Sequence, residues 1–194
     1  KRQAEGADSL VEQYHLDALE AGARIRKGLS IAVERSIVHL ANAFIHHPDN
    51  VSIRERIESR ELSAQELYEY LLKLIYRLLF LMVIEERDLV YPPGVEKRPK
   101  QLYYKYYSVD RLRKMSEKRF LGEDRHNDLW IQLLLTFGLF ENGTYGQQLQ
   151  VKPLAGELFR SGAIGTLANA SLSNKVLLSC IRNLNQFYNP DTKK

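Results

Sequence analysis

Hydrophobic residues recur every three or four positions through most of the chain, a spacing that predicts α-helices. The first pattern begins near Ser9 and ends at the turn formed by Pro48, Asp49 and Asn50. The expected fold is therefore mainly α, an irregular helical bundle. The predicted helices cover about 9–47, 51–59, 63–88, 108–115, 128–140 and 173–187.

The predicted helix over about 63–88 is the most apolar. Ser63 and Glu66 form a capping box that marks its start, because each side chain can bond the other residue's backbone N–H. Apolar and aromatic residues, Tyr76, Phe80 and Val83 among them, occupy most of its circumference. A helix of this kind is expected at the centre of a bundle, enclosed by neighbouring helices. The narrow polar strip consists of Glu69, Lys73, Arg77 and Glu85.

The remaining organisation is simple. Residues 148–160 are the one place where a short strand, a hairpin or an ordered extended loop is expected. Residues 1–8 are expected to be a tail or linker, 9–188 a single helical module, and 189–194 a linker or tag-like end. Because the chain starts with Lys1 rather than methionine, we expect it to be a fragment of a longer protein.

The composition favours a cytoplasmic protein. The chain has one cysteine, Cys180, so it cannot form an internal disulfide, and a single thiol suits a reducing compartment. The start of the sequence shows no secretory signal pattern. The longest apolar run, 71–84, is interrupted by Lys73 and Arg77 and is shorter than the roughly 20 residues of a membrane span.

Basic residues are concentrated in one segment. The net charge of the chain is +4, whereas residues 96–119 carry nine basic and three acidic side chains. Such a segment is compatible with a polyanion partner, and its cations are candidates for contacts with DNA phosphates. The alternative, that these cations are ordinary solvated surface charges, has about equal support. The candidate phosphate contacts are Lys105, Arg111, Arg113, Lys114, Lys118 and Arg119.

Tyrosines accompany these cations at 103, 104, 106 and 107. They could stack on exposed bases, but packing of the segment onto the bundle is the favoured interpretation. The His46-His47 pair lacks further ligands at metal spacing, and a position at a helix end explains it more simply. Cys180 is expected in the core.

No catalytic, cofactor-binding or metal-binding residue is predicted for this chain. An independent enzyme would have to use Glu85, Glu86 and His126, and this interpretation has little support. Adjacent carboxylates point to different sides of a helix. Glu85 or Arg87 is therefore expected to anchor the helix end through buried ion pairs.

Several segments resemble one family in their order along the chain. Residues 71–89, LLKLIYRLLFLMVIEERDL, resemble the L-x-R-L-x-Y-R-L-L-F-L-x-x-A-E-[ED]-R-G-L-L segment of type IIG restriction–modification DNA methylases. That segment lies in the helical region before the methyltransferase domain. The resemblance covers nearly all of Tyr14 to Tyr188, although Lys152 and Ala155 depart from the family pattern. Further similar segments are 14–22, 106–113, 129–134 and 151–159.

The resemblance implies a role for the chain within a larger enzyme. In that family an upstream domain often cuts DNA, and a downstream domain binds S-adenosylmethionine and methylates adenine N6 through [ND]-P-P-[YF]. Residues 91–94 (YPPG) and 189–191 (NPD) do not match that motif. The resemblance thus implies a non-catalytic helical connector that positions nuclease and methyltransferase domains on duplex DNA. Its partners would be the flanking domains of the same polypeptide and DNA.

Any S-adenosylmethionine, and Mg²⁺ for cleavage, would belong to the parent enzyme, a DNA adenine methyltransferase. No cofactor is expected in this chain. The alternative is a purely structural scaffold domain without nucleic-acid contact.

Overall fold

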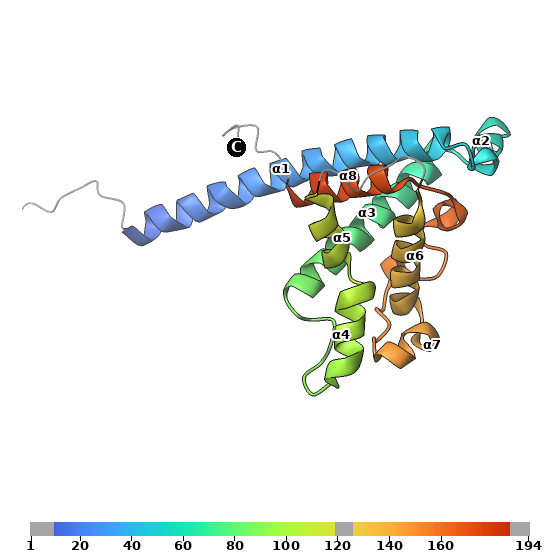
Figure 1. The fold of residues 1–194 in the computed structure, drawn as a ribbon. Coiled ribbons are helices and arrows are strands. Elements are labelled where there is room, and N and C mark those ends of the chain that lie inside the picture. Colours follow the sequence, from blue (N-terminus) through green and yellow to red (C-terminus); the bar gives the residue numbers. More distant parts are fainter. Residues whose placement is uncertain (1–9, 119–125, 187–194) are drawn as a thin grey trace, which may run out of the picture.

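The computed structural model describes residues 10–118 and 126–186, and every regular element within these ranges is helical (Figure 1). The prediction of a mainly α, irregular bundle is confirmed. None of the described helices is both long enough and apolar enough to cross a membrane. The elements are α1 (Leu10–His46), α2 (Val51–Glu58), α3 (Ala64–Glu86), α4 (Lys97–Tyr106), α5 (Val109–Ser116), α6 (Asp128–Glu141), α7 (Gly143–Gly146), η1 (Gln147–Leu149), η2 (Glu157–Phe159), η3 (Gly165–Asn169) and α8 (Asn174–Asn185).

The long helix α1 lies along one side of the bundle, with α8 beside it and α3 crossing it, and its first half extends beyond the other helices (Figure 1). Its buried positions, among them Ala32, Leu40 and Phe44, recur at four- and eight-residue steps on one face. Phe44 meets Trp130 of α6 edge-on, with ring centroids 5.4 Å apart. The core therefore lies between α1, α3, α6 and α8.

Helix α3 starts at the predicted capping box, in which both bonds between Ser63 and Glu66 are present. Its leucine face is buried against α1, α5, η2 and η3. The prediction that it is enclosed all round is wrong, because Tyr76, Phe80 and Val83 are 40–48% exposed. Neighbouring elements cover only part of its circumference, and the aromatic residues lie on the uncovered part.

The predicted polar strip of α3 also needs correction, because Arg77 and Glu85 are buried. Arg77 donates to the carbonyl oxygens of Leu158 and Arg160 at 2.7 and 2.9 Å, and to Glu141 at 2.7 Å. Its guanidinium also lies between the rings of two phenylalanines, 137 and 159. This arginine fastens the loop around η2 to α3 and α6.

Residues 148–160 contain no strand, since two short 3₁₀ turns and extended loop occupy this stretch. The loop is held to the helices by backbone bonds from Val151 to Gly146 and from Leu154 to Phe140. The tail predicted over 1–8 and the end segment predicted over 189–194 lie outside the described residues.

Candidate nucleic-acid interface

The basic segment forms two helices, α4 and α5, at the side of the bundle away from α2 (Figure 1). Sequence reasoning predicted α5, with the Ser108 oxygen accepting from the backbone N–H of Arg111, but it missed α4. Two signals for α4 were available in the sequence. Pro99 stands in its first turn, and Tyr103 follows four residues later on the same face, where both residues are buried.

Glu85 at the end of α3 determines how these helices sit. Its carboxylate accepts from the hydroxyl of Tyr103 at 2.6 Å, and from the backbone N–H groups of Val109 and Asp110 at 2.9 and 2.7 Å. Burial raises the pKa of Glu85. The expected anchor at the end of α3 thus exists, but its partners are a hydroxyl and the N-terminal amides of α5 instead of a cation.

Three of the predicted phosphate contacts lie on α5 and are engaged within the chain. Arg113 and Lys114 each reach the Asp110 carboxylate at 2.6 Å. Burial by itself would raise the pKa of Asp110, but Lys114 and Arg113 hold it below its usual value. Arg111 donates to Gln132 of α6 and to the sulfur of Met115, and burial lowers its pKa. Arg113 and Lys114 therefore share one carboxylate, and Arg111 is held against α6 by uncharged partners.

The outer face of α4 is different. Lys97, Arg98, Gln101, Lys105 and Tyr106 follow one another at steps of one, three and four residues, and all are exposed. We call these five residues the basic α4 face. Lys105 lies over the Tyr106 ring, with its Nζ 5.1 Å from the centroid. Within the described ranges, none of the three cations has an acidic group within 4.0 Å.

The other predicted contacts are less informative. Lys118 is exposed just after α5, and Arg119 lies outside the described residues. The structure thus brings Arg113 and Lys114 together on Asp110. Lys105 instead shares the exposed face of α4 with Lys97 and Arg98, which were not among the predicted contacts.

The tyrosines support the packing interpretation at the inner positions. Tyr103 is fully buried and meets Tyr91, Tyr104 and Phe140 edge-on. The Tyr91 hydroxyl donates to the Leu149 carbonyl at 2.9 Å, and burial raises the pKa of Tyr91 to about 12. Tyr103 and Tyr91 thus fasten α4 to α3, α6 and η1, and the exposed Tyr106 is left on the outer side.

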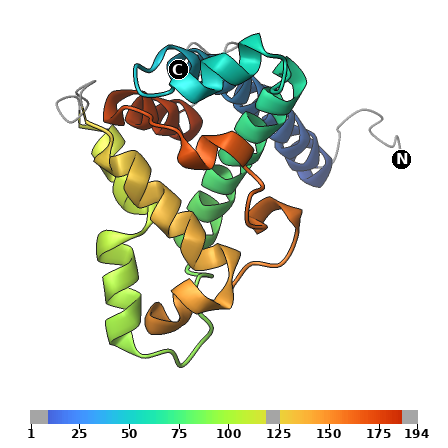
Figure 2. The ribbon, with the colours of Figure 1, turned by 90° about the vertical axis from the view of Figure 1, so that its right-hand side faces the viewer.

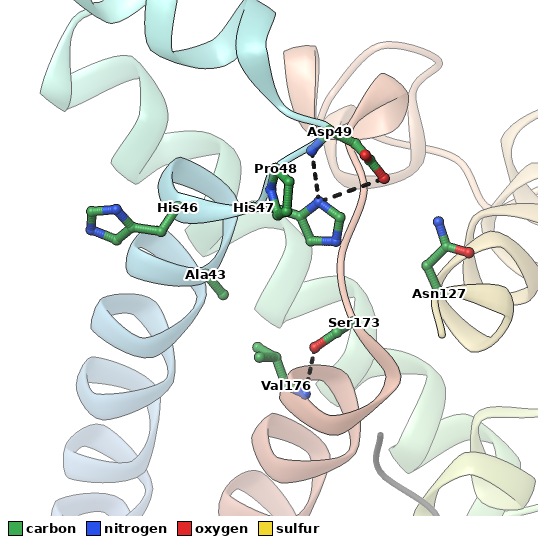
Figure 3. Close-up of a pocket in the computed structure, with 8 residues that line it drawn as sticks. All are labelled: Ala43, His46, His47, Pro48, Asp49, Asn127, Ser173 and Val176. Carbon is green, nitrogen blue, oxygen red and sulfur yellow. Dashed lines mark hydrogen bonds and ion pairs between the residues drawn. The ribbon is translucent and has the colours of Figure 1, made fainter. Parts of the chain in front are cut away.

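A pocket of about 400 Å³ lies where the end of α1 meets the starts of α6 and α8 (Figure 3). His47 faces Asp49, whose backbone N–H donates to the histidine Nδ1 at 3.2 Å, while His46 points away from both. The Ser173 oxygen is occupied as the cap of α8, accepting from Val176. Among the described residues no three His, Cys, Asp or Glu side chains gather at metal-binding distance.

Glu85 and His126, two residues of the enzyme interpretation, make hydrogen bonds within the bundle. The Glu85 carboxylate is occupied by its three donors, whereas Glu86 is exposed. The carbonyl of His126 accepts from the backbone of Asn174 at the start of α8. Cys180 is fully buried, as predicted, and burial raises its pKa to about 12, so the thiol stays protonated.

Comparisons of this chain with protein-family models, with curated proteins and with solved structures found no match.

Proposed function

We propose that this chain is a non-catalytic helical connector of a restriction–modification DNA methyltransferase, and that its basic α4 face contacts the phosphates of duplex DNA. The ordered resemblance of segments 14–22, 71–89, 106–113, 129–134 and 151–159 supports the parent family. The observation that carries the DNA contact is the set of exposed, unpaired cations on α4.

The chemistry of this face suits the sugar–phosphate backbone. Lys97, Arg98 and Lys105 can each release a counterion from DNA, while Gln101 and the Tyr106 hydroxyl can donate to phosphate oxygens. A helix of 10 residues spans about 15 Å, enough to meet several phosphates of one strand. Such contacts supply affinity without sequence preference, so base recognition belongs to another domain.

One observation favours the alternative of a purely structural scaffold. Arg111, Arg113 and Lys114 all bind groups of the chain itself, as structural cations do. The two functions predict different results for α4, since a scaffold needs no unpaired cations there.

The test is DNA binding of the 194-residue chain at several salt concentrations, followed by fluorescence anisotropy of a labelled duplex. In a variant combining Lys97→Gln, Arg98→Gln and Lys105→Gln, the negative slope of log K against log salt should become shallower by about 2.7, because each phosphate contact contributes about −0.9. The control combines Arg24→Gln, Arg35→Gln and Lys152→Gln. These residues are exposed on other surfaces, and the change in net charge is the same.

The outcomes separate the interpretations. A shallower salt dependence in the α4 variant but not in the control supports the proposal. Equal losses would mean that only the net charge matters, and no binding of the unsubstituted chain at low salt would favour the scaffold. A third variant has Arg111, Arg113 and Lys114 changed to Gln. Because these side chains bind within the chain, the variant should have a lower free energy of unfolding and a nearly unchanged salt dependence of DNA binding.

A further inference from the structure

Helix α6 is joined to α7 through Asn142 and Gly143, which form the single Asn-Gly pair in the sequence. Both residues are exposed, and Figure 2 shows this junction near the lower end of the molecule. Asn142 is extended, with φ −146° and ψ 160°, and Gly143 begins α7. A Cβ added at Gly143 would meet nothing within 4 Å, so the space beside its backbone is open and accessible to water.

An asparagine that precedes a glycine can react with its own main chain. When the Gly143 N–H loses its proton to the solvent, the nitrogen can attack Cγ of Asn142, because glycine has no Cβ to hinder the approach. Negative charge then develops on Oδ1 of Asn142. This oxygen already accepts from the backbone N–H groups of Thr144 and Tyr145, at 3.0 and 3.3 Å. Donors that are in place before a reaction stabilise the charge that it develops.

We propose that Asn142 is a self-modification site, at which the folded chain converts the asparagine amide into a carboxylate without an enzyme. The Gly143 nitrogen forms a bond to Cγ, the bond from Cγ to Nδ2 breaks, and ammonia leaves a five-membered cyclic imide. Water then opens the ring. Cleavage between Cγ and the nitrogen gives aspartate on an unchanged main chain. Cleavage between the main-chain carbonyl carbon of residue 142 and the nitrogen gives isoaspartate, whose main chain runs through Cγ. The net reaction consumes one water and releases one ammonia.

Other asparagines of the described chain are less well placed to react. Asn50 and Asn174 are buried, and both polar atoms of each side chain are hydrogen-bonded. Asn127 also stands just before a helix, but Asp128 follows it, and its side chain accepts no capping bond. We therefore expect Asn142 to react first.

The two products should affect the bundle differently. Aspartate can keep the junction as it is, because its carboxylate can accept the same two N–H groups, and the two residue types cap a helix about equally well. Isoaspartate adds a methylene to the main chain between α6 and α7. At the end of α7, a Cβ on Gly146 would lie 2.5 Å from the carbonyl oxygen of Val151 and 2.7 Å from that of Leu139. Such close packing tolerates little displacement, so isoaspartate should loosen α7.

The experiment is incubation of the folded 194-residue chain at mildly alkaline pH, followed by peptide mass spectrometry. Residue 142 should exchange its amide for an acid before any other asparagine. The rate should rise with pH, because the attacking nitrogen must lose its proton. Gly143→Ala should slow the conversion at least tenfold without lowering the thermal midpoint, because alanine favours a helix and its Cβ has open space. Asn127 is the control site within the same molecule.

Ion-exchange chromatography separates the products for thermal melts. The aspartate form, for which Asn142→Asp is the reference, should melt with the unmodified chain, and the isoaspartate form should melt lower. Equal midpoints would contradict the expected effect on α7. The proposal itself is overturned if residue 142 remains an amide in the folded chain, whether or not it converts in urea. It is also overturned if Gly143→Ala leaves the rate unchanged, or if Asn127 converts as fast. None of these results depends on the proposed DNA contact.

Discussion

Replacing Arg77 by methionine should be among the most destabilising single changes in this chain. The arginine side chain is fully buried in the middle of α3, where it donates to two backbone carbonyls and to Glu141. Methionine preserves the apolar part of the side chain and its contacts with the phenylalanine rings. What it removes is every hydrogen bond from this side chain to the loop around η2 and to Glu141.

The magnitude follows from the groups left behind. Each carbonyl, of Leu158 and of Arg160, would lose its charged donor in a partly buried site, at a cost of about 1 kcal/mol. The Glu141 carboxylate is 21% exposed and can regain water, which limits its share. Removal of one partner of a buried pair typically costs about 3–5 kcal/mol, and we expect Arg77→Met to fall in this range.

Urea denaturation followed by fluorescence measures this cost well, because Trp130 is the single tryptophan and is fully buried in the core. Two milder variants keep the test informative if Arg77→Met does not fold. Glu141→Gln retains an acceptor for the guanidinium and should cost about 1 kcal/mol, whereas Arg77→Lys reaches fewer acceptors and should fall between the other two.

A loss below about 1 kcal/mol for Arg77→Met would refute this reasoning. It would mean that the loop around η2 is held mainly by Phe159 and its ring contacts. The double variant Arg77→Met with Glu141→Met should lose less than the sum of the single changes, because no carboxylate then remains without its partner.

Two further outcomes follow from the described contacts. Gly165→Ala should be strongly destabilising in thermal melts, because its φ of +51° suits glycine and a Cβ would lie 2.3 Å from the Tyr70 ring; an unchanged midpoint would contradict this. Burial raises the pKa of Glu85 in the folded chain above its ordinary 4.5. The protonated carboxyl therefore adds to the free energy of unfolding, fully below pH 4.5, and this contribution is lost as the pH rises through the pKa of the folded chain. Glu85→Gln should remove this contribution, and its difference in unfolding free energy from the unsubstituted chain should vary with pH above 4.5; a constant difference would contradict the assignment.

Local signals were enough to predict most of the helices. The start of α3 depends on Ser63 and Glu66, three residues apart, and the end of α1 on Pro48 and Asn50. These interactions lie within one turn of the chain, so the sequence alone reveals them. Helix α4 was missed because its two buried positions, Pro99 and Tyr103, form too short a pattern in a basic segment.

The burial of Arg77 could not be predicted in the same way. Its acceptors are 64 to 83 residues away in the sequence, and two of them are backbone carbonyls, which carry no side-chain signature. A charged residue in a helical pattern is normally assigned to the surface. The same reasoning put Tyr76 and Phe80 inside, although their side of α3 is uncovered.

Part of the arrangement of the candidate DNA contacts could have been predicted from the sequence. Asp110 stands three and four residues before Arg113 and Lys114, the spacing at which helical charges pair, so their engagement could have been inferred. Lys97, Arg98 and Lys105 have no acid at that spacing in either direction. The availability of a cation for phosphate therefore depends on the neighbouring acids more than on the local density of charge, and by that criterion the α4 face is the better candidate. The Arg111–Gln132 contact joins separate helices, and the structure was needed to find it.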